Sequence, residues 1–146
     1  MRSHLLPHDD LVPTVREPPG AAIVARWSAV VVLAAHGAIH AMGFALLWRL
    51  TESGELRYGD SVPEAGSAAG FAIGLVWLLA GAAFVYGAWL LSIRAERWLT
   101  VITASAATSL VVLGLMATET TIGLAVDVAA LAVCVLLWAR RYRPAR

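Results

Sequence analysis

Apolar residues gather into four long blocks along the chain, separated by short polar segments. Each block is uniformly apolar, without the period-two alternation of a membrane barrel strand, and is long enough to cross roughly 30 Å of hydrocarbon as a helix. A helix also satisfies its own backbone hydrogen bonds inside a bilayer. The pattern therefore predicts an all-α, polytopic membrane protein, a bundle of four transmembrane helices with spans at about 27–48, 69–91, 98–116 and 122–138.

Composition and tryptophan placement favour the same prediction. Of the 146 residues, 60% are hydrophobic and 14% are charged, whereas soluble domains carry about 25% charged residues. Trp27, Trp48, Trp98 and Trp138 fall at the ends of the predicted spans. An amphipathic ring prefers that position because it matches the headgroup level of the bilayer.

Arginine gives the predicted orientation, because the chain contains no lysine. Nine of the eleven arginines lie before the first span, between the second and third, or after the fourth. The loop at 49–68 carries only Arg49 and Arg57, with several acidic residues. The positive-inside rule therefore predicts that both termini lie in the cytoplasm and that loop 49–68 is external, either as a short cap or as a mobile segment.

These features divide the chain into a flexible cytoplasmic tail at 1–21, a transmembrane domain at 22–139 and a basic cytoplasmic tail at 140–146. The first tail has four prolines and lacks an apolar core of signal-peptide length. Pro7 lies between His4 and His8 and opposes a helix that would bring both to one metal. The chain uses arginine and no lysine, and it is rich in alanine. This composition is typical of high-GC bacteria, so we expect a multi-pass protein of the bacterial plasma membrane.

The first apolar block holds two histidines four residues apart, in the stretch "AAHGAIHAMGF". His36 and His40 therefore share one helix face. At 1.5 Å per residue, His40 lies about 12 Å and His36 about 18 Å below the outer boundary, while Asp127, Ser109 and Trp77 lie at about 8, 10 and 12 Å. Exposing an aspartate to lipid costs about 2.5–3.5 kcal/mol. We therefore predict a direct His40–Asp127 bond within an intramembrane polar network of His36, His40, Ser109 and Asp127.

Small residues indicate where helices approach one another. Close backbone contact is the usual role of such stripes in membranes, either within one subunit or across a dimer. The hydroxyl groups of the third block, including Ser105 and Ser109, are predicted to bond mainly to carbonyls four residues earlier on their own helix. The predicted packing glycines are Gly43, Gly70, Gly74 and Gly81.

Three stretches resemble a group of uncharacterised small four-helix bacterial membrane proteins. "HGAIHAMGF" is similar to the group's H-G-x-I-H-x-x-G-F signature in the first helix, and "GLVWLLAGAAFVYGAWLL" resembles its Trp-containing second helix. "TTIGLAVDVAALAV" resembles its fourth helix, which commonly opens with a Gly followed by an Asn; Asp127 stands near the Asn position here. The resemblance covers about residues 27–138 and implies a four-helix fold in a membrane, with no known activity.

The common signatures of enzymes are missing from the sequence. Cys134 is the single cysteine, and the chain has no zinc pattern, phosphate-binding loop, nucleophile elbow or pair of intramembrane carboxylates. These observations favour a protein that is not an enzyme. The small net charge of +1 gives no indication of nucleic-acid binding.

The favoured hypothesis is a structural or accessory membrane subunit whose His/Asp network specifies helix pairing, with the bilayer and a homodimer or a partner subunit as its contacts. A second hypothesis is a proton-coupled or small-solute transporter using His36, His40 and Asp127. The same three side chains could also hold a metal ion. Haem would need a histidine from another helix, and hence a dimer or partner chain, because His36 and His40 lie on one side. No cofactor is predicted.

Overall fold

The structure is a computed structural model that describes residues 19–52, 57–116 and 121–141. Its described part is all-helical, as predicted. Three helices are long and apolar enough to cross a membrane, and the third in chain order is a shorter apolar helix. The elements are α1 (Pro19–Leu47), a 3₁₀ turn (Tyr58–Asp60), α2 (Ala68–Ser92), α3 (Trp98–Met116) and α4 (Thr121–Arg141).

The two outer helices extend beyond their predicted ends. α1 begins at Pro19 instead of near Trp27, because proline suits the first position of a helix and the alanine-containing segment that follows continues it. α1 therefore takes in the last three residues, 19–21, of the segment predicted as a tail. α4 continues to Arg141 and takes in the start of the predicted basic tail. The rest of both predicted tails, residues 1–18 and 142–146, lies outside the described residues.

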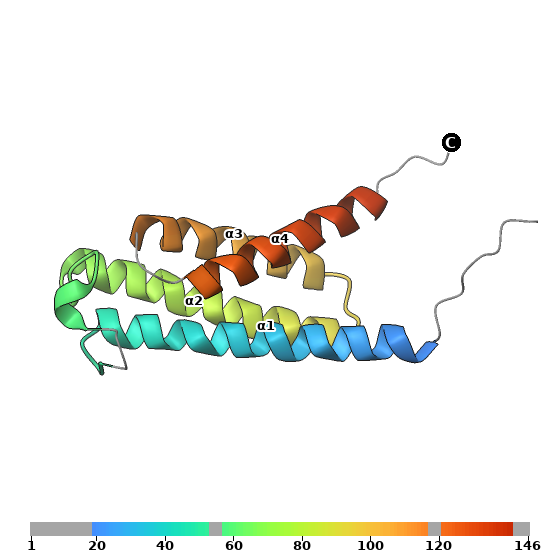
Figure 1. The fold of residues 1–146 in the computed structure, drawn as a ribbon, viewed down its shortest axis with the longest axis horizontal. Helices are drawn as coiled ribbons and strands as arrows, with labels where there is room; N and C mark the ends of the chain where they lie inside the picture. Colours follow the sequence, from blue (N-terminus) through green and yellow to red (C-terminus); the bar gives the residue numbers. More distant parts are fainter. Residues whose placement is uncertain (1–18, 53–56, 117–120, 142–146) are drawn as a thin grey trace, which may run out of the picture.

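α1 and α2 form an antiparallel hairpin, α3 packs on α2, and α4 packs on α3. α4 runs obliquely to the other helices, and its C-terminal half diverges from them (Figure 1). The N-terminal end of α1 and the C-terminal end of α4 lie at the same end of the molecule (Figure 1). Consecutive helices are thus neighbours, and α1 meets α4 through side chains rather than through an extended helix contact.

Glycines let α1 and α2 approach closely. A Cβ atom placed on Gly37 would lie 2.6 Å from the carbonyl oxygen of Gly81, and one placed on Gly81 would lie 2.6 Å from that of Gly37. Gly43 leaves space for the ring of Trp77, and Gly74 for that of Trp48. Three of the predicted packing glycines, Gly43, Gly74 and Gly81, therefore lie in this contact within one chain.

Gly70 has a different role from the one predicted. Its Cβ position would meet the carbonyl oxygen of Glu64, which belongs to the loop before α2 and not to a neighbouring helix. Ser67 caps α2 by accepting a hydrogen bond from the Gly70 N–H. Gly87 was not among the predicted glycines, although its Cβ position would lie 2.3 Å from Ile102 of α3.

Two apolar clusters fill the interior. The first joins all four helices around Phe84, which is completely buried, and includes Cys134. The second lies around Leu47 and Trp77. The opposite faces of the helices expose aliphatic side chains such as Val31, Leu79 and Leu136, as a lipid-facing surface would.

α1 ends in a Schellman motif in which Arg49 adopts the left-handed conformation, with φ of 54°. The Leu50 N–H bonds to the Ala45 carbonyl and the Arg49 N–H to the Leu46 carbonyl. Arg49 then donates from Nε to the Ala65 carbonyl at 2.8 Å. This bond ties the end of α1 to the loop that leads into α2.

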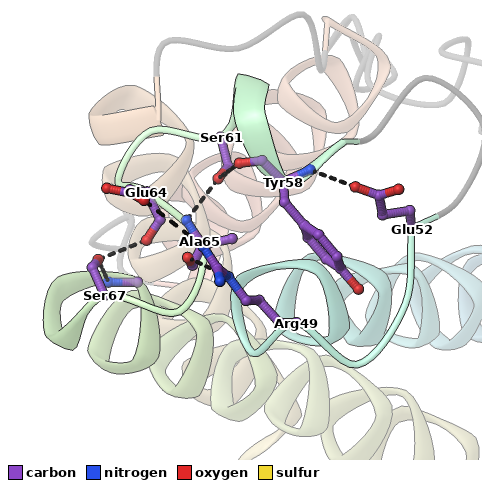
Figure 2. A network of polar contacts seen from close by, with 8 residues as sticks. Arg49, Glu52, Tyr58, Ser61, Glu64, Ala65 and Ser67 are labelled. Carbon is purple, nitrogen blue, oxygen red and sulfur yellow. Dashed lines mark hydrogen bonds and ion pairs between the residues drawn. The ribbon is translucent and has the colours of Figure 1, made fainter.

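The described part of loop 49–68 forms an ordered cap (Figure 2). Tyr58 donates its backbone N–H to Glu52 Oε1 at 3.0 Å. Ser61 donates its hydroxyl to the Tyr58 carbonyl and accepts from the Ala65 N–H, each at 2.9 Å. These bonds connect the described residues of the loop to one another and to the end of α1.

Candidate functional site

Four buried polar side chains from three helices meet inside the bundle. α1 supplies His36 and His40 on one face, α3 supplies Ser109 and α4 supplies Asp127. Ser109 and Asp127 have no exposed surface, and the two histidines are 6% and 4% exposed. The structure thus brings together all four residues of the predicted polar network, which we call the polar ring.

The bonds within the polar ring differ from the predicted pairing. His36 Nε2 forms a hydrogen bond of 2.8 Å with Asp127 Oδ1, and Ser109 Oγ bonds to Asp127 Oδ2 at 2.5 Å. His40 Nε2 lies 2.9 Å from Ser109 Oγ, and His40 Nδ1 lies 2.9 Å from the carbonyl oxygen of His36. The predicted direct bond between His40 and Asp127 is therefore wrong: His36 is the direct partner, and His40 reaches the carboxyl group through Ser109.

The starting depth of α4 explains this error. Counting 1.5 Å per residue from a common outer boundary places Asp127 nearer to His40 in depth. In the structure α4 does not begin at that boundary: its first turn lies further into the bundle than the C-terminal ends of α1 and α3 (Figure 1). Asp127 is therefore displaced toward His36, one turn deeper on α1.

α2 contributes an aromatic wall to the site. The ring of Phe84 contacts His36 and His40 at centroid distances of 4.9 and 5.6 Å. Trp77 contacts His40 at 6.0 Å, and the two imidazoles lie edge to face at 4.7 Å. The sequence placed Trp77 at the depth of His40, but it gave no signal for Phe84. These rings exclude water from the polar groups and hold the imidazoles in fixed orientations.

With His36 neutral and protonated on Nε2, two proton arrangements satisfy every hydrogen bond of the ring. His40 must donate from Nδ1, because its partner there is a carbonyl oxygen. In the first arrangement Ser109 donates to an ionised Asp127 and a charged His40 donates to Ser109. In the second, a neutral Asp127 donates to Ser109, which donates to a neutral His40. Both contain the same number of protons, so the hydroxyl of Ser109 connects an acid and a base without any movement of heavy atoms.

The neutral arrangement avoids the cost of placing two charges in a dry site, which is several kcal/mol per ion before their attraction is counted. It resembles what an asparagine at position 127 would form, since an amide group also offers one acceptor and one donor. Such a satisfied network fixes the relative positions of α1, α3 and α4. Its chemistry includes proton sharing, but Ser109 is too buried to act as a nucleophile on a bulky substrate.

The hydroxyl groups of α3 follow the prediction only in part. Thr103 donates to the Leu99 carbonyl four residues earlier on its own helix. Ser105 instead donates to the Ala80 carbonyl of α2 at 2.7 Å, and Ser109 bonds within the polar ring. The predicted local bond is therefore wrong for Ser105, because the neighbouring helix α2 offers an acceptor, whereas Ser109 takes the place in the polar network that was predicted for it.

The ring also contains the three residues considered as metal ligands from the sequence. His36, His40 and Asp127 each offer one ligand atom, and these atoms lie within 4.8 Å of one another. Cys134 is buried in the apolar cluster around Phe84 and is not part of this group. Among the described residues, no histidine from another helix joins His36 and His40.

Comparisons with protein-family models, curated proteins and solved structures returned no match to this chain.

Proposed function

We propose that this chain is a four-span integral protein of a bacterial plasma membrane, with both termini in the cytoplasm, that acts as a structural or accessory subunit. The observation that carries the proposal is the polar ring, in which every buried polar side chain has a partner and which joins three helices. Such a ring specifies one arrangement of helices, since any other arrangement leaves polar groups unpaired in an apolar environment. A rigid bundle with lipid-facing aliphatic surfaces suits a subunit that supports a membrane assembly.

The proposed topology is supported by the chain ends and by charge. α1 starts and α4 finishes at the same end of the molecule (Figure 1), as expected for an even number of spans. Arginines are concentrated at that end, including Arg26 at the start of α1 and Arg94 and Arg97 between α2 and α3. The cap formed by the described part of loop 49–68 lies at the other end (Figure 1).

Labelling of single cysteines tests the topology. In a Cys134→Ala background, Gly59→Cys places a thiol in the cap where a Cβ atom meets no other atom within 4 Å. We expect this thiol to react with a membrane-impermeant maleimide on intact cells. Ser3→Cys is the matched variant and is expected to react only after the cells are permeabilised. Labelling of Ser3→Cys on intact cells would contradict the orientation.

Proton flux into liposomes tests the subunit role against transport. Transport is the alternative to the subunit role, because the ring can share a proton between Asp127 and His40 through Ser109. His40 is the last side chain in this series of hydrogen bonds. We expect proteoliposomes of the wild type and of His40→Ala to acidify at rates within about twofold of protein-free liposomes, as expected for a ring enclosed by packed helices. A wild-type rate tenfold above the lipid background that His40→Ala abolishes would replace the subunit role by transport.

A further inference from the structure

We propose that His36, His40 and Asp127 bind one divalent transition-metal ion of the zinc class. This inference uses the polar ring of the proposed function and adds a ligand to it. The three residues are buried, and their ligand atoms already lie within 4.8 Å of one another. Two imidazoles and a carboxylate are a donor set that suits zinc and related first-row ions.

The distances permit binding after a small adjustment. A tetrahedral ion with bonds of about 2.0–2.1 Å places its ligand atoms roughly 3.4 Å apart. His36 Nε2 and Asp127 Oδ1 lie 2.8 Å apart and would separate slightly, while the widest pair would close from at most 4.8 Å. The required shifts are roughly 0.5–1.5 Å, which rotations of the imidazole and carboxyl groups can supply without moving a helix.

The outer contacts of the ring are those that metal ligands use. A histidine ligand usually donates its second ring N–H to a carbonyl or carboxylate, which fixes the tautomer and points the other nitrogen at the metal. His40 makes this contact from Nδ1 to the His36 carbonyl. Ser109 bonds to Asp127 Oδ2 and leaves Oδ1 on the side of His36. For both imidazoles to bind the ion, two contacts have to break: the one between His40 Nε2 and Ser109 Oγ, and the one between His36 Nε2 and Asp127 Oδ1. His36 then carries its proton on Nδ1.

The proton count gives the proposal a quantitative signature. In either proton arrangement the ring holds four exchangeable protons on His36, His40, Ser109 and Asp127. With the metal bound through Nε2 of both histidines, three remain: one on Nδ1 of each imidazole and one on the hydroxyl of Ser109. Binding of one ion therefore displaces one proton to solvent, in line with the general coupling of metal binding to proton release.

The test uses the full-length protein in detergent, freed of metal with a chelator. Zn²⁺ is titrated by calorimetry in two buffers of different ionisation enthalpy, and Co²⁺ is titrated by visible absorption, where a tetrahedral site gives intense bands. We expect one ion per chain, release of about one proton per Zn²⁺, and cobalt bands typical of nitrogen and oxygen ligands.

Asp127→Asn is the decisive variant because an amide preserves the hydrogen bonds of the neutral ring but is a poor ligand. We expect it to keep the wild-type thermal stability without metal and to bind Zn²⁺ at least tenfold more weakly. Ser109→Ala keeps all three ligands, so it is expected to retain one ion per chain while its metal-free form loses stability. The variant His4→Ala/His8→Ala is the control for metal bound by the N-terminal tail and is expected to bind normally.

Three results would overturn the proposal. Absence of Zn²⁺ binding to the wild type, unchanged affinity in Asp127→Asn, or loss of binding in His4→Ala/His8→Ala would each exclude the ring as a metal site. None of these results bears on the subunit role, because that role predicts the stability of the metal-free ring and the absence of proton flux. Conversely, proton flux that depends on His40 would overturn the subunit role. It would not affect the metal proposal, which the Zn²⁺ titration tests independently.

Discussion

Replacement of Asp127 by leucine is expected to lower the free energy of unfolding of the metal-free protein by about 2–5 kcal/mol. The leucine removes the hydrogen-bond partner of His36 Nε2 and one partner of the Ser109 hydroxyl. Each buried polar group left without a partner costs about 1–3 kcal/mol. The measurement is thermal or SDS-induced unfolding in detergent, followed by near-ultraviolet circular dichroism.

Asp127→Asn is the matched control and is expected to stay within about 1 kcal/mol of the wild type, because an amide can replace every bond of the neutral ring. Its oxygen would accept from His36 and its NH₂ group would donate to Ser109. Equal losses in both variants would show that the carboxylate charge, rather than the bonding pattern, stabilises the bundle.

Gly37→Ala is expected to lower the free energy of unfolding by about 1–3 kcal/mol, the usual cost of overpacking. The new methyl group would lie 2.6 Å from the Gly81 carbonyl oxygen and 3.0 Å from the Cβ atom of Phe84. Backbone oxygen cannot rotate away, so α1 and α2 would have to separate. The same unfolding measurement applies.

Gly114→Ala is the control for this substitution, because a Cβ atom there meets no other atom within 4 Å. Alanine has the higher helix propensity, so this variant is expected to be neutral or stabilised by up to about 1 kcal/mol. A Gly37→Ala protein as stable as Gly114→Ala would show that α1 and α2 do not make the close contact.

The fold was predictable in the features that depend on one segment at a time. The length and uniform apolarity of each block determine that it is helical, since a helix closes its own hydrogen bonds regardless of its neighbours. Close packing at Gly43, Gly74 and Gly81 was predicted because glycine in an apolar helix favours backbone contact. The start of α1 and the role of Gly70 were not predicted, since both depend on how the chain enters a helix from the preceding loop or tail.

The candidate site also has features that could be predicted from the sequence and features that could not. That His36, His40, Ser109 and Asp127 form one polar group was predictable from the sequence, because buried polar side chains in an apolar environment must pair with one another. The individual bonds, from His36 to Asp127 and from His40 through Ser109, depend on how the helices are placed in space. Hydrogen bonds form over about 3 Å, which is shorter than one helical turn of 5.4 Å. The depth at which α4 enters the bundle (Figure 1), which no single segment encodes, therefore selects the partner of each histidine.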